Sequence, residues 1–226
     1  MSCLGCGAGL QEHREISYCA TCLQDVRLLL EPLCNHCGKP FDGAAGESHL
    51  CGYCLKNGWH FKQARAVVRY QPPITETVKI FKYGGKMHGL ATFGALSKQY
   101  LAQQNLSQPD VLVPVPLHIK RLRQRGFNQA LILCRRIFPA WRDRIAPHIM
   151  EKKLWTQPQT GLSGPERRRN VRNTFRVRRP EFVVGKKILL VDDVFTTGAT
   201  VNECARILRR NKASEVNVFT FARAID

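Results

Sequence analysis

Residues 187–200 read Lys-Ile-Leu-Leu-Val-Asp-Asp-Val-Phe-Thr-Thr-Gly-Ala-Thr. The four apolar residues 188–191 do not alternate with polar ones, which is typical of a strand covered on both faces. Two carboxylates follow, and a loop rich in Thr and Gly then leads into a helical pattern at 201–208. This order predicts a buried strand that brings two acids and a small loop to the carboxyl edge of a sheet, where open α/β sheets bind ligands.

The side chains expected at this edge suit a sugar phosphate. Asp192 and Asp193 repel each other unless they meet hydroxyl groups or a cation. A ribose offers two hydroxyls, and Mg²⁺ prefers carboxylate and phosphate oxygens. The free N–H groups and the positive dipole end of the following helix suit a phosphate. The expected phosphate loop consists of Thr196, Thr197, Gly198, Ala199 and Thr200.

This stretch resembles the phosphoribosyl pyrophosphate (PRPP) signature of type I phosphoribosyltransferases. In that family the two acids hold the ribose hydroxyls and the loop holds the 5′-phosphate. The resemblance implies that Asp192 and Asp193 are the catalytic acids and that residues 196–200 bind PRPP. The alternative, a tight strand-to-helix turn with acidic residues, does not explain the acids and the Thr/Gly loop together.

Eight of the ten cysteines lie in the first 54 residues, as four Cys-x-x-Cys pairs. Spacers of 12 and 13 residues separate the first two and the last two pairs. Such spacing is typical of a zinc ribbon, in which each pair gives two thiolates to a tetrahedral ion. We therefore expect one or two structural zinc ions. The predicted ligands are Cys3, Cys6, Cys19 and Cys22 for one site and Cys34, Cys37, Cys51 and Cys54 for the other.

Two other interpretations of these cysteines remain open. A disulfide framework is disfavoured in a reducing cytosol. Redox chemistry at one Cys-x-x-Cys pair would not require four pairs. Cys134 and Cys204 stand alone on predicted helices and are interpreted as core residues.

Strand and helix patterns alternate after residue 60. Strands are predicted at 64–70, 110–113, 145–150, 188–191 and 215–222, and helices at 74–81, 88–104 and 128–137. This alternation indicates an α/β fold with a doubly wound parallel sheet of the type I phosphoribosyltransferase type. The expected domains are a double zinc ribbon at 1–60 and a phosphoribosyltransferase-like domain at 61–226.

Composition places the chain among soluble proteins with an anionic partner. No apolar run approaches the roughly 20 residues that span a membrane, and the start lacks the pattern of a signal peptide. We therefore expect no membrane insertion and a cytoplasmic location. The net charge is +18, and residues 117–187 hold 19 Lys/Arg against four Asp/Glu. This middle segment is the expected electrostatic contact for a nucleic acid.

Two parts of that segment are candidate phosphate-binding elements. The first is a loop expected between the strand at 110–113 and the next helix, and a solvated basic helix end is its alternative interpretation. Its cations are Lys120, Arg121, Arg123 and Arg125, expected to bind pyrophosphate or a nucleic acid phosphate. The second is a polar segment at 157–175, interpreted as a flexible loop that closes over PRPP or, alternatively, as a disordered basic loop. Its cations are Arg167, Arg168, Arg169 and Arg172.

The motifs in combination resemble the ComF/GntX family over nearly the whole chain. They are the Cys-x-x-Cys pairs, Phe-Lys-Tyr-Gly-Gly-Lys (81–86), Val-Pro-Val-Pro-Leu (113–117), Arg-Gly-Phe-Asn-Gln-Ala (125–130), Gln-Thr-Gly-Leu-Ser (159–163) and the acid-Thr/Gly stretch. The resemblance implies a cytosolic protein with a zinc-binding head, tied to natural competence and the use of imported DNA. It also implies DNA-uptake or helicase-type protein partners.

Two functional hypotheses follow from the sequence. In the first, the protein is an enzyme that binds magnesium–PRPP, and a nucleophile displaces pyrophosphate at the anomeric carbon. In the second, it is a non-catalytic or regulatory factor that binds single-stranded DNA or another nucleic acid and retains the PRPP fold. The two are compatible, because a PRPP site and a DNA-binding surface can coexist in one chain.

Overall fold

The computed structural model describes residues 2–10, 15–41, 46–83, 89–104, 106–156 and 163–225. Within these residues, the centre is a parallel sheet of four strands in the order β1, β6, β5, β2. The strands are β1 (Gln63–Arg69), β2 (Val111–Pro114), β5 (Lys187–Phe195) and β6 (Glu215–Arg223). The strands predicted at 64–70, 110–113, 188–191 and 215–222 are therefore confirmed.

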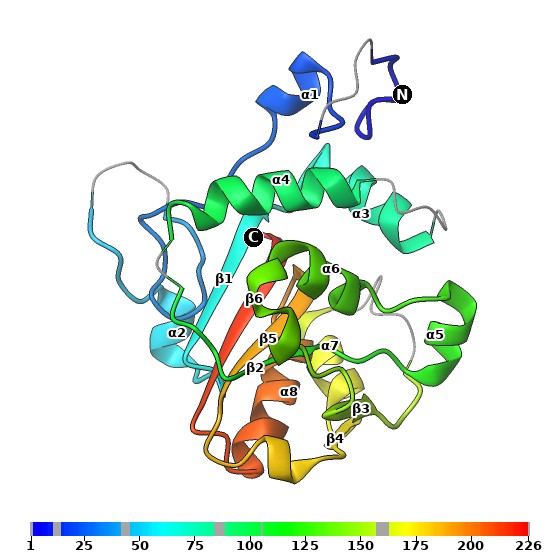
Figure 1. Cartoon of the computed structure of the whole chain (residues 1–226). Helices are drawn as coiled ribbons and strands as arrows, with labels where there is room; N and C mark the ends of the chain where they lie inside the picture. Colours follow the sequence, from blue (N-terminus) through cyan, green and yellow to red (C-terminus); the bar gives the residue numbers. More distant parts are fainter. Residues whose placement is uncertain are drawn as a thin grey trace.

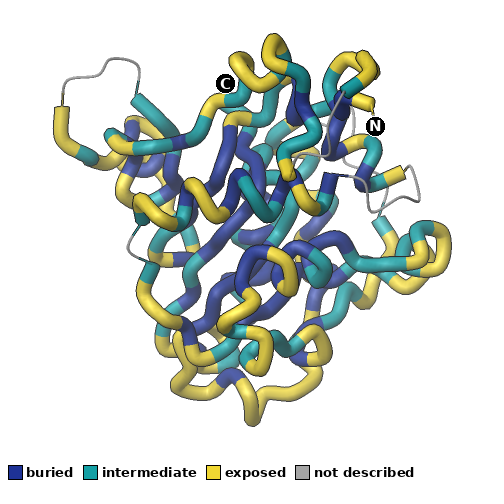
Figure 2. The backbone as a smooth tube through the Cα atoms, turned by 45° about the horizontal axis from the view of Figure 1, so that its top comes forward, coloured by how far each residue is buried: buried dark blue, intermediate teal, exposed yellow. Residues whose placement is uncertain are grey.

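Helices cover both faces of this sheet (Figure 1). On β5, Leu189 and Val191 belong to one core cluster, whereas Ile188 and Leu190 belong to the other. Because both faces of the strand are buried, its sequence is apolar without alternation. Figure 2 shows buried backbone at the centre of the molecule and exposed backbone around it. The covering helices are α3 (Ile74–Tyr83), α4 (Leu90–Leu101) and α6 (Gln129–Ile137) on one face and α8 (Ala199–Arg210) on the other.

The cysteine-rich segment contributes two short helices that lie apart. The helix α1 (Ala20–Gln24) lies beyond α4, and α2 (Gly52–Lys56) lies beside the start of β1 (Figure 1). The segment is joined to the sheet by an antiparallel bridge between Leu28 and Val68 of β1. The two groups of Cys-x-x-Cys pairs are thus attached to different parts of the phosphoribosyltransferase-like fold.

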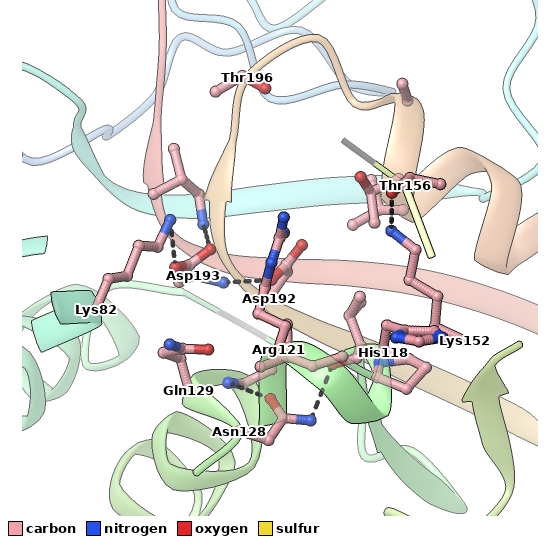
Figure 3. A pocket seen from close by; sticks show the side chains of 18 of the residues that line it. Lys82, His118, Arg121, Asn128, Gln129, Lys152, Thr156, Asp192, Asp193 and Thr196 are labelled. Atoms are coloured by element: carbon pink, nitrogen blue, oxygen red, sulfur yellow. Dashed lines mark hydrogen bonds and ion pairs between the residues drawn. The ribbon is translucent and has the colours of Figure 1, made fainter. Parts of the chain in front are cut away.

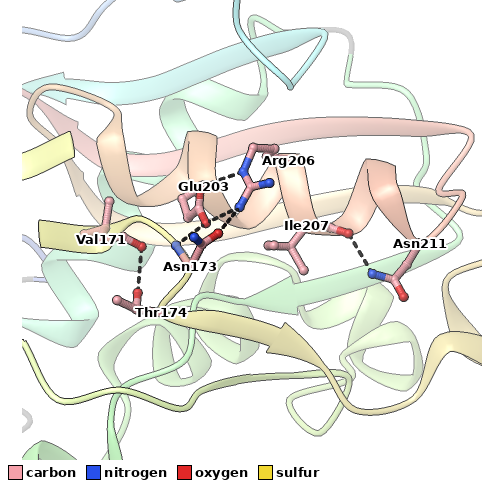
Figure 4. Close-up of polar contacts among 7 residues, drawn as sticks. All are labelled: Val171, Asn173, Thr174, Glu203, Arg206, Ile207 and Asn211. Atoms are coloured by element: carbon pink, nitrogen blue, oxygen red, sulfur yellow. Dashed lines mark hydrogen bonds and ion pairs between the residues drawn. The ribbon is translucent and has the colours of Figure 1, made fainter. Parts of the chain in front are cut away.

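A second, antiparallel sheet of two strands packs beside α8. It consists of β3 (Met150–Lys152) and β4 (Phe175–Val177), with α7 (Gly164–Val171) between them in sequence. The turn before β4 is tied to α8, because the backbone N–H of Asn173 donates to Glu203 (2.8 Å). Arg206 donates to both Glu203 (2.7 Å) and the Asn173 side chain (2.9 Å), as Figure 4 shows. This network fixes the segment that follows α7 on the helix that begins at the phosphate loop.

Three predictions about local structure are corrected. The strand predicted at 145–150 is wrong, because a 3-10 helix, η1 (Pro139–Arg144), ends there and Ile145 makes only an isolated bridge to Leu112. The basic segment after β2 is not a loop but the helix α5 (Ile119–Arg125). The arginines 167–169 lie on α7, not in a loop. A second 3-10 helix, η2, spans Pro180–Phe182.

The short helices were missed because their capping residues lie in polar, basic sequence that has the composition of a loop. The His118 side chain accepts from the backbone of Lys120 at the start of α5, and Gly126 ends that helix in the left-handed region. At α7, Ser163 and Glu166 form a capping box. In the part of the chain that the structure describes, no helix is long and apolar enough to cross a membrane.

Candidate functional site

A cavity of ≈810 Å³ opens at the carboxyl edge of the parallel sheet. Its lining comes mainly from α3, α5, α6, the two strands β3 and β4, α7 and the junction of β5 with α8. Both predicted acids and four of the five loop residues (Thr196, Gly198, Ala199 and Thr200) are among the lining residues, whereas Thr197 lines a smaller cavity. Figure 3 shows Asp192, Asp193 and Thr196 at the site. The tertiary fold therefore brings the acid pair and the Thr/Gly loop to one concave site, as the sequence predicts.

Asp193 is held by a lysine that the sequence interpretation did not assign. The ammonium of Lys82, at the end of α3, lies 2.6 Å from a carboxylate oxygen of Asp193 (Figure 3). Burial alone would lower the pKa of Lys82, but the charge and the hydrogen bond of Asp193 hold it above its usual value. Lys82 follows Ile74 and Val78 at intervals of four residues, which places a cation on the apolar face of the predicted helix. This pattern could have indicated a paired, functional lysine.

Asp192 lies directly beside Asp193, and both acids are half-buried. Its carboxylate accepts from the backbone N–H of Asp193 at 2.9 Å. Burial, followed by the negative charge of Asp193, raises the pKa of Asp192 to about 8. Near neutral pH the pair therefore carries less negative charge than two free carboxylates, and this limits the repulsion that adjacent acids would otherwise suffer.

The Thr/Gly loop forms the turn from β5 into α8. Gly198 has φ +71° and precedes the first helical residue, Ala199, whose N–H approaches the Thr197 hydroxyl at 3.4 Å. A Cβ on Gly198 would lie 2.5 Å from the Phe195 ring, so this turn requires glycine both for its dihedral angles and for space. The loop and the N-terminus of α8 thus border the cavity.

The four cations of α5 divide into two pairs. Arg121 and Arg125 line the cavity, while Lys120 and Arg123 are exposed outside it. Burial, together with the other charges around it, lowers the pKa of Arg125, although Tyr83 and Asp193 partly oppose this. Two of the four predicted phosphate ligands on this element are therefore placed where a bound anion could reach them.

The arginines of α7 face different sides. Arg167 lines the large cavity, and Arg168 lines a smaller one on the other side of the phosphate loop. Arg169 and the helix-capping Arg172 are exposed. Residues 157–162, which include most of the Gln-Thr-Gly-Leu-Ser motif, lie outside the described residues, as do residues 84–86 of Phe-Lys-Tyr-Gly-Gly-Lys.

Three further lining residues were not assigned from the sequence. Lys152 on β3 donates to the hydroxyl of Thr156 at 2.7 Å, and burial, followed by the charge of Arg121, lowers its pKa to about 8. Tyr83 and Trp155 lie at the mouth of the cavity, 74% and 42% exposed. They reach the site from distant segments, so no local pattern pointed to them.

Both aromatic rings at the mouth are covered by cations. The guanidinium of Arg125 lies 5.0 Å from the centre of the Tyr83 ring, and that of Arg121 lies 5.4 Å from the centre of the Trp155 ring. The ammonium of Lys120 also lies over Trp155, at 5.9 Å. The mouth therefore combines positive charge with exposed aromatic faces.

The eight amino-terminal cysteines form two separate clusters. In each cluster the four sulfur atoms lie within 4.8 Å of one another, and no sulfur is used in a disulfide. Backbone N–H groups point at the sulfurs, from Cys19 to Cys3 and from Cys51 to Cys34, each at 3.3 Å. Four converging sulfurs that accept such bonds fit a tetrahedral zinc ion, so the predicted all-cysteine zinc ribbon is confirmed.

Comparisons with known proteins match two separate parts of the chain. A double zinc ribbon domain matches residues 1–55, and a phosphoribosyl transferase domain matches residues 153–226. The chain is similar to competence protein F of Haemophilus influenzae, at 31% identity over 98% of this chain and 96% of that protein. It is also similar to the DNA utilization protein YhgH of Escherichia coli K12, at 33% identity over 92% of this chain and 90% of that protein.

Among solved structures, the chain is similar to an allosteric regulatory enzyme of purine biosynthesis. The TM-score is 0.37 and the sequence identity 23%, over 62% of this chain and 29% of that one. The chain thus covers less than a third of that protein's length.

Proposed function

Because this chain belongs to the ComF/GntX family, whose members include competence protein F and the DNA utilization protein YhgH, we propose that it binds magnesium–PRPP and acts in the uptake or use of extracellular DNA. One observation carries the proposal: the acid pair and the Thr/Gly loop open on the same cavity as Arg121, Arg125 and Arg167. Hydroxyl-binding acids, a phosphate loop and separate cations are the three parts that PRPP requires.

Different residues of the site would bind different parts of PRPP. Asp192 and Asp193 face the ribose hydroxyls, and residues 196–200 receive the 5′-phosphate at the start of α8. Arg121, Arg125 and Arg167 would meet the pyrophosphate, because their planar groups suit phosphate oxygens. Magnesium, when bound with PRPP, would supply positive charge to the pyrophosphate oxygens.

Transfer on this site would need no nucleophile from the protein. The lone pair of the acceptor forms a bond to the anomeric carbon, and the bond from that carbon to the pyrophosphate oxygen breaks. The electron pair leaves with pyrophosphate, and the acceptor releases its proton to solvent. The cations around the cavity would stabilise the charge that develops on the leaving group.

Calorimetric titration of zinc-loaded protein with PRPP and magnesium tests this proposal. Binding in the micromolar range, lost in the Asp192→Ala/Asp193→Ala variant, would support the site. A Lys186→Ala/Lys187→Ala variant is a suitable control, because these exposed lysines lie at the opposite edge of the sheet. Absence of binding to the wild-type protein would refute the PRPP proposal.

A second candidate function is binding of single-stranded nucleic acid at the same cavity mouth. The cation-covered rings of Tyr83 and Trp155 favour it, because exposed aromatic faces stack on bases while the cations meet the phosphates. The fold brings these two rings together at the mouth from separate segments of the chain. DNA-uptake or helicase-type proteins in the cytoplasm are the corresponding proposed partners.

Salt dependence separates this candidate from non-specific attraction. Affinity for a single-stranded oligonucleotide should fall steeply with salt. Neutralising Arg121, Arg125 and Arg167, which line the cavity, to Gln should reduce the slope by up to about 2. Neutralising Lys186, Lys187 and Arg210 changes the net charge equally on the opposite side of the site and should leave the slope nearly unchanged. Equal effects of the two variants would reject a binding surface at the cavity.

A further inference from the structure

The two cysteine clusters have different neighbours. Around the first cluster, the hydroxyl of Tyr18 bonds that of Thr77 on α3 at 2.6 Å, and a Cβ on Gly5 would lie 2.5 Å from Pro73. In the described part of the chain this cluster therefore packs toward α3, near α1 and α4 in Figure 1. The second cluster (Cys34, Cys37, Cys51 and Cys54) lies instead beside the phosphate loop, as the following contacts show.

Trp59 makes the first link between the second cluster and the loop. Its indole N–H donates to the sulfur of Cys54 at 3.2 Å. The same ring supports Gly198 so closely that a Cβ there would lie 2.9 Å from it, and its edge meets Phe195 with ring centres 6.0 Å apart. One side chain thus touches a predicted zinc ligand and the glycine of the phosphate loop.

Arg223, at the end of β6, makes the second link. Its guanidinium donates to the backbone oxygen of Cys37 at 2.7 Å and approaches the sulfur of Cys37 at 3.5 Å. It also lies 4.3 Å from the ring centre of Phe195, the residue that precedes the loop. Arg223 is only 8% exposed, so this charge is buried between the thiolates and the loop.

The space between the cluster and the loop is a small cavity of ≈250 Å³. Cys37 and Cys51 line it on one side and Thr196 and Thr197 on the other. The backbone of the segment after the cluster is fixed to α8 as well, because the N–H of His60 donates to the Asn202 side chain at 2.8 Å. A displacement of the cysteine cluster would therefore also move the phosphate loop, and the reverse.

From these contacts we propose that Trp59 and Arg223 are positioning residues that couple metal occupancy of the second cysteine cluster to anion binding by the phosphate loop. A zinc ion fixes the Cys54 and Cys37 sulfurs, and hydrogen bonds to such ligands hold their donors in place. Trp59 and Phe195 then hold the turn at Gly198, where the packing leaves no free space. By linkage, a ligand on the loop must change the metal affinity of the cluster by the same factor by which the metal changes the affinity of the loop for that ligand.

The test uses ribose 5-phosphate as the probe, because it fills the phosphate loop without pyrophosphate or magnesium. The full chain is loaded with cadmium, whose NMR signal reports the geometry of each four-sulfur site. Saturation with ribose 5-phosphate is expected to move the resonance of the second cluster and to leave that of the first. The Trp59→Phe variant, which keeps an aromatic ring but loses the N–H bond to Cys54, assigns the second resonance.

Affinity measurements complete the experiment. Trp59→Phe and Arg223→Met are expected to weaken ribose 5-phosphate binding by about 5-fold or more, the lower end of usual coupling between sites, with two metal ions still bound. Tyr18→Phe beside the first cluster is the matched control and should bind as the wild type does. Arg223→Lys should restore part of the loss, because the positive charge is retained.

The inference rests on the proposed phosphate site. Calorimetry distinguishes failure of the coupling from failure of the proposed function. If wild-type protein binds neither ribose 5-phosphate nor PRPP, the proposed function fails and the coupling with it. If ribose 5-phosphate binds while the second resonance stays fixed, or both resonances move equally, the coupling is overturned and the proposed function stands. Wild-type affinity in both variants would overturn it in the same way.

Discussion

The ammonium of Lys82 lies 2.6 Å from the carboxylate of Asp193, across the gap between α3 and the carboxyl end of β5. This ion pair joins the helix that packs on one face of the sheet to the acid pair at its edge. It also places a positive charge beside two adjacent carboxylates that would otherwise repel each other. A sugar bound at this site would meet an acid that is already held in place.

Replacing Lys82 with Met should therefore destabilise the folded protein. The change keeps most of the length of the side chain but leaves Asp193 without its cation. We expect a loss of about 2–3 kcal/mol in the free energy of unfolding, below the range for fully buried pairs because both side chains retain some exposure. Urea denaturation near neutral pH measures it. Lys79→Met, at an exposed position on the same helix, is the control and should change stability little.

The raised pKa of Asp192 predicts a pH dependence of stability. Between an unfolded pKa of about 4 and a folded pKa of about 8, the folded state holds a proton that the unfolded state has released. The contribution of this group therefore weakens as pH rises through that window and is constant above it. The urea midpoint of unfolding should fall with rising pH across this window, and it should fall less steeply in Asp192→Asn than in the wild type. The exposed Asp143→Asn variant should keep the wild-type slope, and an unchanged slope in Asp192→Asn would contradict the prediction.

Metal analysis should find two zinc ions per chain. Each cysteine cluster has four converging sulfurs, and a structural zinc ion contributes on the order of 10 kcal/mol to the fold around it. Cys6→Ser and Cys34→Ser should therefore each reduce the zinc content by about one ion, from different clusters. Elemental analysis after gel filtration measures this. A chain that retains two ions in both variants would show that the clusters do not bind zinc as assigned.

The parts of the candidate site whose position the sequence could predict are those with local signals. The acid pair and the phosphate loop follow one strand, and their placement needs only the strand-turn-helix order. The Cys-x-x-Cys pairs carry their own spacing, so both clusters could be assigned without a structure. The cap at Ser163 and Glu166 was a signal of the same kind, but the surrounding arginines gave that segment the composition of a loop.

The remaining residues reach the site through tertiary structure. Lys152, on β3, and Trp155, which follows that strand, arrive at the cavity only when the two-stranded antiparallel sheet packs beside α8. Arg223 lies on the last strand, 186 residues from the Cys37 backbone that it contacts. No pattern in the chain relates such distant positions, so the interior of the site and its connection to the zinc ribbon required the fold.

Substitution of Gly198 by Ala tests the geometry of the phosphate loop most directly. The residue has φ +71°, and its new Cβ would lie 2.5 Å from Phe195 and 2.9 Å from Trp59, so the turn must move. We expect PRPP affinity to fall by about 10-fold or more. A displaced turn would lose one or two hydrogen bonds to the phosphate, and each hydrogen bond to a charged group contributes roughly 1.5 kcal/mol. Gly58→Ala is the matched control, because a Cβ at Gly58 meets nothing within 4 Å. Calorimetry on both variants decides the matter, and wild-type affinity in Gly198→Ala would show that the turn does not hold the phosphate.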